Sequence, residues 1–174
     1  MRKENIPPGE NPPEDVFVLV QTPKGSSIKY MLDPRFGGMR VEKYFFPPVN
    51  FPGDYGTVPQ TRGDNGNPLD ALVIVSSPGH PGTVVQARPI GILRMQDDKG
   101  LDDKLICVPI NDQRFAKVGA IDDLPMSMLK EIRTFFETYE NLGPDKFVKV
   151  RGWEGIEKVR EVINHSIELY KKVK

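Results

Sequence analysis

The chain has 174 residues, which predicts one domain spanning residues 1–174 with room for a sizeable core. It carries 24 basic and 24 acidic side chains, and 38% of its residues are hydrophobic. This balance excludes a disordered chain and argues against a protein dedicated to nucleic acid or to a membrane surface. No apolar run reaches the ~18 residues of a membrane span, and the N-terminus lacks a signal peptide's apolar core, so we expect a cytoplasmic protein.

Proline and glycine divide the first two-thirds of the chain into short extended segments. The expected strands are Val16–Gln21, Ile28–Leu32, Met39–Phe46, Ala71–Val75, Val84–Met95 and Leu105–Pro109. Many short strands at close spacing favour a small closed barrel, because closure removes exposed sheet edges. The single Cys107 lies in an apolar run and is expected to be a buried thiol.

The hydrophobic periodicity changes to a helical spacing near residue 125. Apolar side chains recur at that spacing over Leu129–Tyr139, with Pro125 in the first turn and Gly143 past the end. A second amphipathic helix is expected from about Glu154 onward. The predicted fold class is therefore α+β, a barrel with two amphipathic helices packed on it.

Carboxylates placed next to apolar segments are the most informative feature for function. Asp70 directly precedes a run of five apolar residues, where a carboxylate needs a partner, a cation or an exposed strand end. Asp97, Asp102 and Lys104 flank a charged loop, and the last two share one face if a strand begins at residue 102. Beside Asp70, this loop could hold a divalent cation and a phosphate. The alternative is a solvated hairpin tip.

Basic and phenolic side chains point in the same direction. Lys29 and Lys43 lie on expected strands, Tyr55 in a proline-rich stretch, and Tyr139 at the end of the first helix. Lysine and tyrosine at the mouth of an acidic barrel suit a polyphosphate ligand. The alternative for each one is an ordinary surface position.

Other catalytic schemes lack residues. The two histidines have no cysteine or histidine at metal-binding spacing, so zinc and Cys–His catalysis have no candidates. The glycine-containing loops lack the GK[ST] element of a phosphate-binding loop. Oligonucleotide binding has only fold analogy behind it, and the neutral charge argues against it.

Seven segments resemble, in the same order, landmarks of the soluble inorganic pyrophosphatases of family I, prokaryotic type. They are Ile28-Lys29-Tyr30, Asp54-Tyr55-Gly56, Gly66-Asn67-Pro68-Leu69-Asp70, Arg88-Pro89-Ile90-Gly91, Asp97…Asp102-x-Lys104, Phe135-Phe136-Glu137-Thr138-Tyr139 and Val148-Lys149-Val150-x-Gly152-Trp153. The resemblance implies a small OB-like five-stranded closed β-barrel with two helices. It also implies Mg²⁺-dependent hydrolysis of pyrophosphate to two phosphates by in-line attack of metal-bound water, and a homohexamer.

The resemblance assigns roles residue by residue. Positions that keep the family's residue type are Lys29, Tyr55, Asp70, Asp97, Asp102, Lys104 and Tyr139. Positions that differ are Gln21 and Met31 for metal-site glutamates, Lys43 for a phosphate-binding arginine, Asn65 and Asn67 for two aspartates, and Glu140 for a phosphate-binding lysine. The resemblance thus implies Tyr55, Asp70 and the altered Asn67 as catalytic positions. Substrate would contact Lys29, Lys43, Lys104 and Tyr139, and metal would contact Asp70, Asp97, Asp102 and, weakly, Asn65.

Each change has a chemical consequence. Asn67 stands at the position of the general base and cannot accept a proton, a loss that typically costs ~10²–10⁴-fold in rate. Asn65 offers magnesium an uncharged oxygen, and Met31 offers it an unsuitable thioether. Lys43 meets phosphate as a point charge only, and Glu140 opposes the charge of the substrate.

We therefore expect a pyrophosphatase whose turnover is weakened, with Mg²⁺ or Mn²⁺ bound in fewer copies than is usual for the family. The expected partners are pyrophosphate or phosphate, with neither nucleic acid nor a membrane. The alternative is a catalytically inactive paralogue that binds phosphate or pyrophosphate. Such a paralogue could also act as a structural subunit, in a homohexamer or in a hetero-oligomer with an active sister chain.

Overall fold

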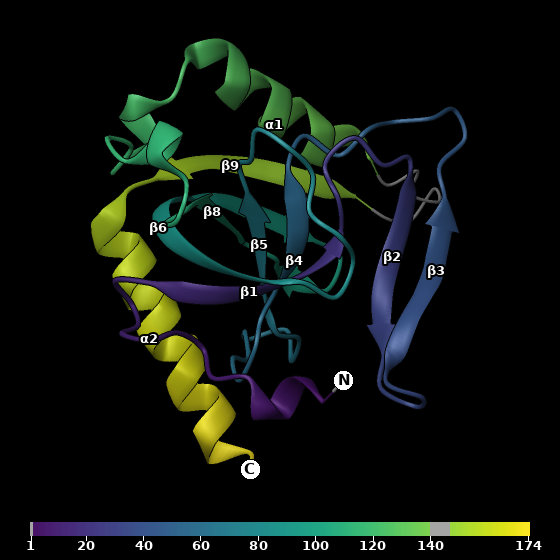
Figure 1. Cartoon of the computed structure of the whole chain (residues 1–174), viewed down its shortest axis with the longest axis vertical. Helices are drawn as coiled ribbons and strands as arrows, with labels where there is room; N and C mark the ends of the chain where they lie inside the picture. The colour runs from purple at the N-terminus through teal and green to yellow at the C-terminus, as the bar shows by residue number, and fades with distance from the viewer. Residues whose placement is uncertain (1, 140–146) are drawn as a thin grey trace.

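The computed structural model describes residues 2–139 and 147–174 as a mostly β structure flanked by two α-helices (Figure 1). The strands are β1 (Val16–Thr22), β2 (Ile28–Asp33), β3 (Gly38–Tyr44), β4 (Asp54–Val58), β5 (Leu69–Val73), β6 (Val84–Asp97), β7 (Gly100–Leu101), β8 (Lys104–Pro109) and β9 (Val148–Glu154). The helices are α1 (Met126–Thr138) and α2 (Ile156–Lys172), with 3₁₀ turns η1 (Lys3–Asn5), η2 (Gln113–Phe115) and η3 (Ile121–Asp123). Neither helix in these ranges combines the length and the apolar character needed to cross a membrane.

Five strands close into a ring, which confirms the expected barrel. The order is β1-β4-β5-β8-β6, and β6 pairs back onto β1. The β5–β8 pair is parallel, and the other pairs of the ring are antiparallel. Strand β9 pairs with β6 outside the ring, and β2 and β3 form a separate hairpin beside the barrel (Figure 1).

The long strand β6 can bend around the barrel because of Gly91. The register of its pairing with β8 shifts between Pro89 and Gly91. A Cβ added at Gly91 would lie 1.9 Å from Cγ1 of Ile121 in η3, so only glycine fits beneath this turn. The bend lets one strand serve the ring and also carry β9.

The two helices cover different parts of the barrel. Ile132, Phe135 and Phe136 of α1 are buried in a cluster that includes Tyr55. Ile163 of α2 is buried in a second cluster with β-strand residues. Each such side chain contributes roughly 1.5–3 kcal/mol through burial, so the amphipathic faces hold both helices on the barrel.

Several boundaries differ from the sequence-based prediction. The strand β4 was not expected, because proline and glycine on either side of it masked its extended residues. The helix α2 begins at Ile156 instead of Glu154, because Glu154 still pairs in β9. The strand β5 begins at Leu69, so Asp70 lies within it, and β8 begins at Lys104, so Asp102 precedes it. Gly143 lies outside the described residues.

Candidate active site

A cavity of about 410 Å³ lies between the barrel and the β2–β3 hairpin, and most of the predicted residues line it. Those that do are Gln21, Lys29, Met31, Tyr55, Asn65, Asn67, Asp70, Asp97, Asp102, Lys104 and Tyr139. Most of these side chains come from six strands and one helix end: β1, β2, β4, β5, β6, β8 and the end of α1.

Two predicted residues are not among those lining the cavity. Lys43 lies opposite Lys29 in the β2–β3 register, and its Nζ is 5.3 Å from the ring centroid of Phe45. Its neighbour Glu42 lines the cavity instead and pairs with Lys29 at 3.2 Å. The β2–β3 register shifts between Lys29 and Tyr30, so Glu42 and Lys43 both lie next to Lys29 at this irregularity. Glu140 lies outside the described residues.

Lys104 is the centre of the polar cluster in the cavity. Its Nζ donates to Asp70 Oδ2 at 2.7 Å, to Asp102 Oδ2 at 3.0 Å and to Tyr55 Oη at 3.1 Å. The parallel β5–β8 register places Asp70 directly beside Lys104. The partner that the sequence required for Asp70 is therefore this buried ammonium group.

The cluster fixes the charge state of its members. Burial alone would lower the pKa of Lys104, but the charge of Asp70 and the other acidic groups around it raises that pKa well above its usual range. Burial raises the pKa of Tyr55 well above normal, and the charge of Asp70 adds to this effect. Burial also raises the pKa of Asp70, against the opposing charge of Lys104. At neutral pH, Lys104 is a cation and Tyr55 a neutral phenol that still has a proton to donate.

Asn65 and Asn67 lie in the loop between β4 and β5. The side-chain oxygen of Asn65 accepts the backbone N–H of Asn67 at 3.0 Å, and the Gly63 N–H donates to the Asn67 carbonyl at 2.7 Å. Gly66, at φ 85°, provides the left-handed backbone of this turn. The amides keep the loop compact but bring no negative charge into the cavity.

The other two altered positions are also engaged within the chain. Gln21 Nε2 donates to Thr57 Oγ1 at 3.3 Å. The sulfur of Met31 accepts from Arg40 Nη2 at 3.0 Å, and Arg40 Nε in turn donates to Asp33 at 2.9 Å. Where the resemblance implies glutamates, the cavity therefore has an amide and a thioether held by their own neighbours.

Carboxylate oxygens, the donors that magnesium prefers, remain at one side of the cavity. Asp70, Asp97 and Asp102 line it, and Asp97 Oδ1 accepts the Lys99 N–H at 2.8 Å. Among residues 2–139 and 147–174, no three carboxylate, imidazole or thiolate groups are arranged so as to hold a metal ion. The ammonium group of Lys104 already contacts one carboxylate oxygen of Asp70 and one of Asp102.

Sequence reasoning missed four charged residues of the lining, which are Lys3, Glu42, Asp98 and Lys99. Asp98 and Lys99 belong to the charged loop already singled out, whereas Glu42 lies at the register shift of the β2–β3 hairpin, which the sequence pattern does not show. Nothing in the sequence pattern pointed to Lys3, which is brought near by the folding of the N-terminal segment.

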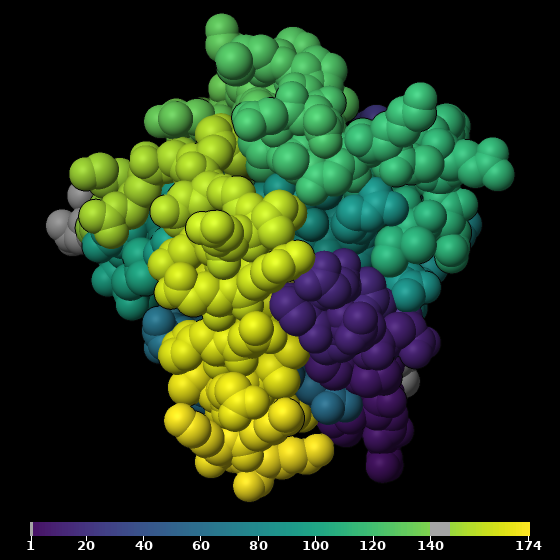
Figure 2. All heavy atoms as spheres, turned by 90° about the vertical axis from the view of Figure 1, so that its left-hand side faces the viewer, coloured from purple at the N-terminus to yellow at the C-terminus, as the bar shows by residue number. Residues whose placement is uncertain are grey.

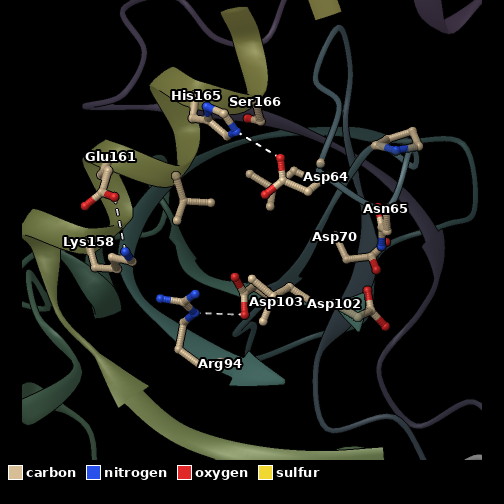
Figure 3. A pocket seen from close by; sticks show the side chains of 15 residues that line it. Asp64, Asn65, Asp70, Arg94, Asp102, Asp103, Lys158, Glu161, His165 and Ser166 are labelled. Atoms are coloured by element: carbon tan, nitrogen blue, oxygen red, sulfur yellow. Dashed lines mark hydrogen bonds and ion pairs between the residues drawn. The ribbon is translucent and has the colours of Figure 1, made fainter. Parts of the chain in front are cut away.

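A second cavity, of about 320 Å³, adjoins the first and shares Asn65, Asp70 and Asp102 with it; Figure 3 shows the side chains that line this second cavity. Its ionisable side chains are paired with one another or with neighbours. These pairs are Arg94 with Asp103 at 2.9 Å and Glu154 at 2.7 Å, Lys158 with Glu161 at 3.1 Å, and His165 with Asp64 at 3.0 Å. The His165–Asp64 contact joins α2 to the loop that carries Asn65.

Known proteins match this chain over most of its length. A family model described as inorganic pyrophosphatase matches residues 18–171. An inorganic pyrophosphatase of Aquifex pyrophilus is 44% identical over 174 residues, covering 99% of this chain and 98% of that protein. One from Agrobacterium fabrum is 42% identical and covers 98% of each.

Solved structures agree with the sequence matches. The crystal structure of inorganic pyrophosphatase from Thermus thermophilus superposes with a TM-score of 0.94 at 38% identity, covering 98% of this chain and 99% of that one. The structure from Helicobacter pylori gives a TM-score of 0.86 at 41% identity over 91% and 94% of the two chains. The chain therefore belongs to the inorganic pyrophosphatase family.

Proposed function

We propose that this chain, folded as one domain, binds pyrophosphate in the 410 Å³ cavity and hydrolyses it slowly with the help of Mg²⁺ or Mn²⁺. The observation that carries the proposal is the cluster of Lys104, Asp70, Asp102 and Tyr55 on the wall of this cavity. Family membership supplies the substrate class.

The cationic and phenolic side chains suit the phosphate groups. Lys29 and Lys104 each present an ammonium group to the cavity. The phenol of Tyr55 accepts from Lys104 and so directs its own proton elsewhere, toward a phosphate oxygen. Tyr139 packs against Phe135 at a centroid distance of 4.9 Å, and the Nζ of Lys29 lies 5.6 Å from the Tyr139 ring centroid. This packing limits where the ends of both side chains can be, which favours orientation of the substrate.

The donor set fits a reduced number of metal ions. Asp70, Asp97 and Asp102 would have to move closer together to hold an ion, because the described residues contain no preformed three-ligand site, and the Asn65 oxygen would be a weak neutral ligand. A bound divalent ion would neutralise phosphate charge and lower the pKa of a water molecule. Lys104 neutralises part of the carboxylate charge and so weakens the attraction for a second ion.

Turnover is expected to be slow because the cavity lacks a base at residue 67. The amide of Asn67 cannot take a proton from the attacking water, and loss of a general base costs ~10²–10⁴-fold. Positioning and electrostatic stabilisation by the remaining groups can still accelerate phosphoryl transfer.

The alternative is a phosphate- or pyrophosphate-binding paralogue without turnover, or a structural subunit. The engagement of Gln21, Met31 and Asn65 by neighbouring groups favours it, because these side chains are held without a metal. Calorimetry with pyrophosphate, with and without metal, separates the two cases. A structural subunit binds no pyrophosphate, whereas a binding protein gives heat without phosphate release.

Phosphate release from pyrophosphate, first with Mg²⁺ and then with Mn²⁺, tests the main proposal. We expect a rate well below that of the Thermus thermophilus relative under the same conditions, and a rate equal to it would contradict the proposal. The rescue variant Asn65→Asp/Asn67→Asp/Gln21→Glu/Met31→Glu should raise the rate at least about 100-fold.

A matched control variant adds four carboxylates at exposed positions outside the cavity: Asn111→Asp, Gln113→Glu, Ser127→Glu and Asn164→Asp. It should leave the rate unchanged. A rescue variant that folds but stays silent would show that the missing carboxylates are not the cause of slow turnover.

We also propose a cytoplasmic homohexamer, or a hetero-oligomer with an active sister chain. Exposed apolar side chains such as Phe46 (91% exposed) and Met126 (69%) support association. Light scattering of the purified chain tests it, and a monomer at micromolar concentration would contradict it.

A further inference from the structure

A third pocket, of about 300 Å³, lies at the end of the molecule where the N-terminal segment meets the end of α2. Both views place these two segments side by side (Figures 1 and 2). The charged side chains in its lining are Lys3, Arg62 and Lys174, and the described lining contains no carboxylate side chain.

These cations differ from those of the second cavity in having no acidic partner. Within the described ranges, none of the three forms an ion pair with a carboxylate. Lys174 Nζ lies 5.7 Å from the ring centroid of Tyr170, a contact that leaves its three N–H groups available. The guanidinium of Arg62 lies beside Gly66, since a Cβ added there would be 3.5 Å from Nη2. The pocket therefore offers unused hydrogen-bond donors of one charge.

Hydrogen bonds hold the backbone around the pocket. The Arg62 N–H donates to the Ser166 carbonyl at 2.9 Å, which joins the β4–β5 loop to α2. Gln60 Nε2 donates to the carbonyls of Glu4 at 3.0 Å and Ile6 at 3.1 Å, which holds η1 and thus Lys3 in place. The backbone that carries Lys3 and Arg62 is therefore held in place, which reduces the entropy lost when a ligand binds.

The electrostatic balance favours an anion. The carbonyl end of α2 also lies here, with a partial charge of about −0.5, and it opposes an anion. An α-carboxylate on Lys174 would subtract one further unit of positive charge from the pocket. The three positive charges of Lys3, Arg62 and Lys174 exceed these two negative charges together, so the lining stays cationic.

We propose that this pocket is a second anion site that binds inorganic phosphate. Lys3 and Pro68 line both this pocket and the active-site cavity, so the two spaces adjoin. Phosphate has the size and the acceptor oxygens to meet several cationic donors at once. The proposal goes beyond the proposed function and does not depend on turnover, because two of its three cations, Arg62 and Lys174, do not line the active-site cavity.

Titration calorimetry with inorganic phosphate, in metal-free buffer containing a chelator and at low ionic strength, tests the site. Loss of two charged donors in Arg62→Gln/Lys174→Gln should weaken phosphate binding at least about tenfold. The control Lys117→Gln/Arg151→Gln removes the same charge from exposed positions outside the pocket and should stay within about twofold. Arg62→Lys keeps the charge and should stay within about threefold.

Each result decides the matter. Any of three results overturns the proposed site. They are unchanged phosphate binding in the pocket variant, an equal loss of binding in the control, and no binding to the wild-type chain up to about 10 mM phosphate. If the double variant fails to fold, Lys174→Gln alone replaces it, since that side chain is at the exposed end of the chain. The active-cavity variant Lys29→Gln should leave binding at this pocket intact. A chain without pyrophosphate turnover that still binds phosphate here contradicts only the proposed function.

Discussion

Replacing Lys104 by methionine removes a cation that contacts Asp70, Asp102 and Tyr55 at distances of 2.7, 3.0 and 3.1 Å. Lys104 is only 1% exposed, so methionine fills a similar buried volume without the charge. The cost comes mainly from leaving the carboxylates without their cation, and breaking such a buried pair costs about 3–5 kcal/mol. For a chain of this length that corresponds to a fall in Tm of roughly 6–20 °C.

The loss of stability in Lys104→Met is expected to depend on pH. Burial raises the pKa of Asp70, and removal of Lys104 raises it further. A carboxyl group with a raised pKa in the folded state destabilises the fold as the pH rises through that pKa, because the folded state holds the proton longer than the unfolded one. The loss of stability in Lys104→Met should therefore be larger at pH 7 than at pH 4.

Urea unfolding in a chelating buffer at the two pH values measures this difference. Lys99→Met is the control, because Lys99 lines the same cavity but is exposed, and it should change stability by less than about 0.5 kcal/mol. The double variant Lys104→Met/Asp70→Asn should recover part of the loss. A cost below about 1 kcal/mol at pH 7, or an equal cost at pH 4, would refute the electrostatic account of the cluster.

Three further predictions concern the scaffold. Burial raises the pKa of Asp54, against two backbone N–H groups that donate to it at 2.9 Å. Ionisation of this carboxyl group therefore lowers the stability of the fold as the pH rises above about 4. Asp54→Asn should flatten that part of a profile of stability to urea against pH. Gly91→Ala should cost about 1–3 kcal/mol in thermal unfolding through its clash with Ile121, and Ile121→Ala in the same chain should relieve much of the clash; an unaffected Tm would contradict the close approach. Burial raises the pKa of the Cys107 thiol well above normal, so a thiol reagent should label it only when urea unfolds the chain, as mass spectrometry can check.

The hydrophobic pattern predicted most of the fold, because strands and helices with one buried face show it directly. The strand β4 escaped prediction because its partners β1 and β5, not its own sequence, define it. The β9 strand escaped because it is half-exposed, with a pattern in which no residue is fully buried. Both are cases in which pairing between distant segments outweighs local preference.

The sequence predicted most of the residues that line the site, but not how they are arranged. The need of Asp70 for a partner was readable, whereas the choice of Lys104 depends on a parallel register between β5 and β8. That Glu42 and not Lys43 lines the cavity is tied to the β2–β3 hairpin, whose register shifts between Lys29 and Tyr30. Irregularities of one residue decide which side chains face the cavity, and sequence periodicity does not locate them.

The parallel pairing of β5 with β8 also bears on the order of events when the chain folds. Asp70 and Lys104 are 34 positions apart, and the whole of β6 must cross between them before they meet. A hairpin can form early from neighbours, but this pair requires closure of a long loop, which slows its formation. Withdrawal of the Lys104 ammonium from water therefore requires this long-range pairing, and a kinetic probe placed there would report when β5 and β8 meet.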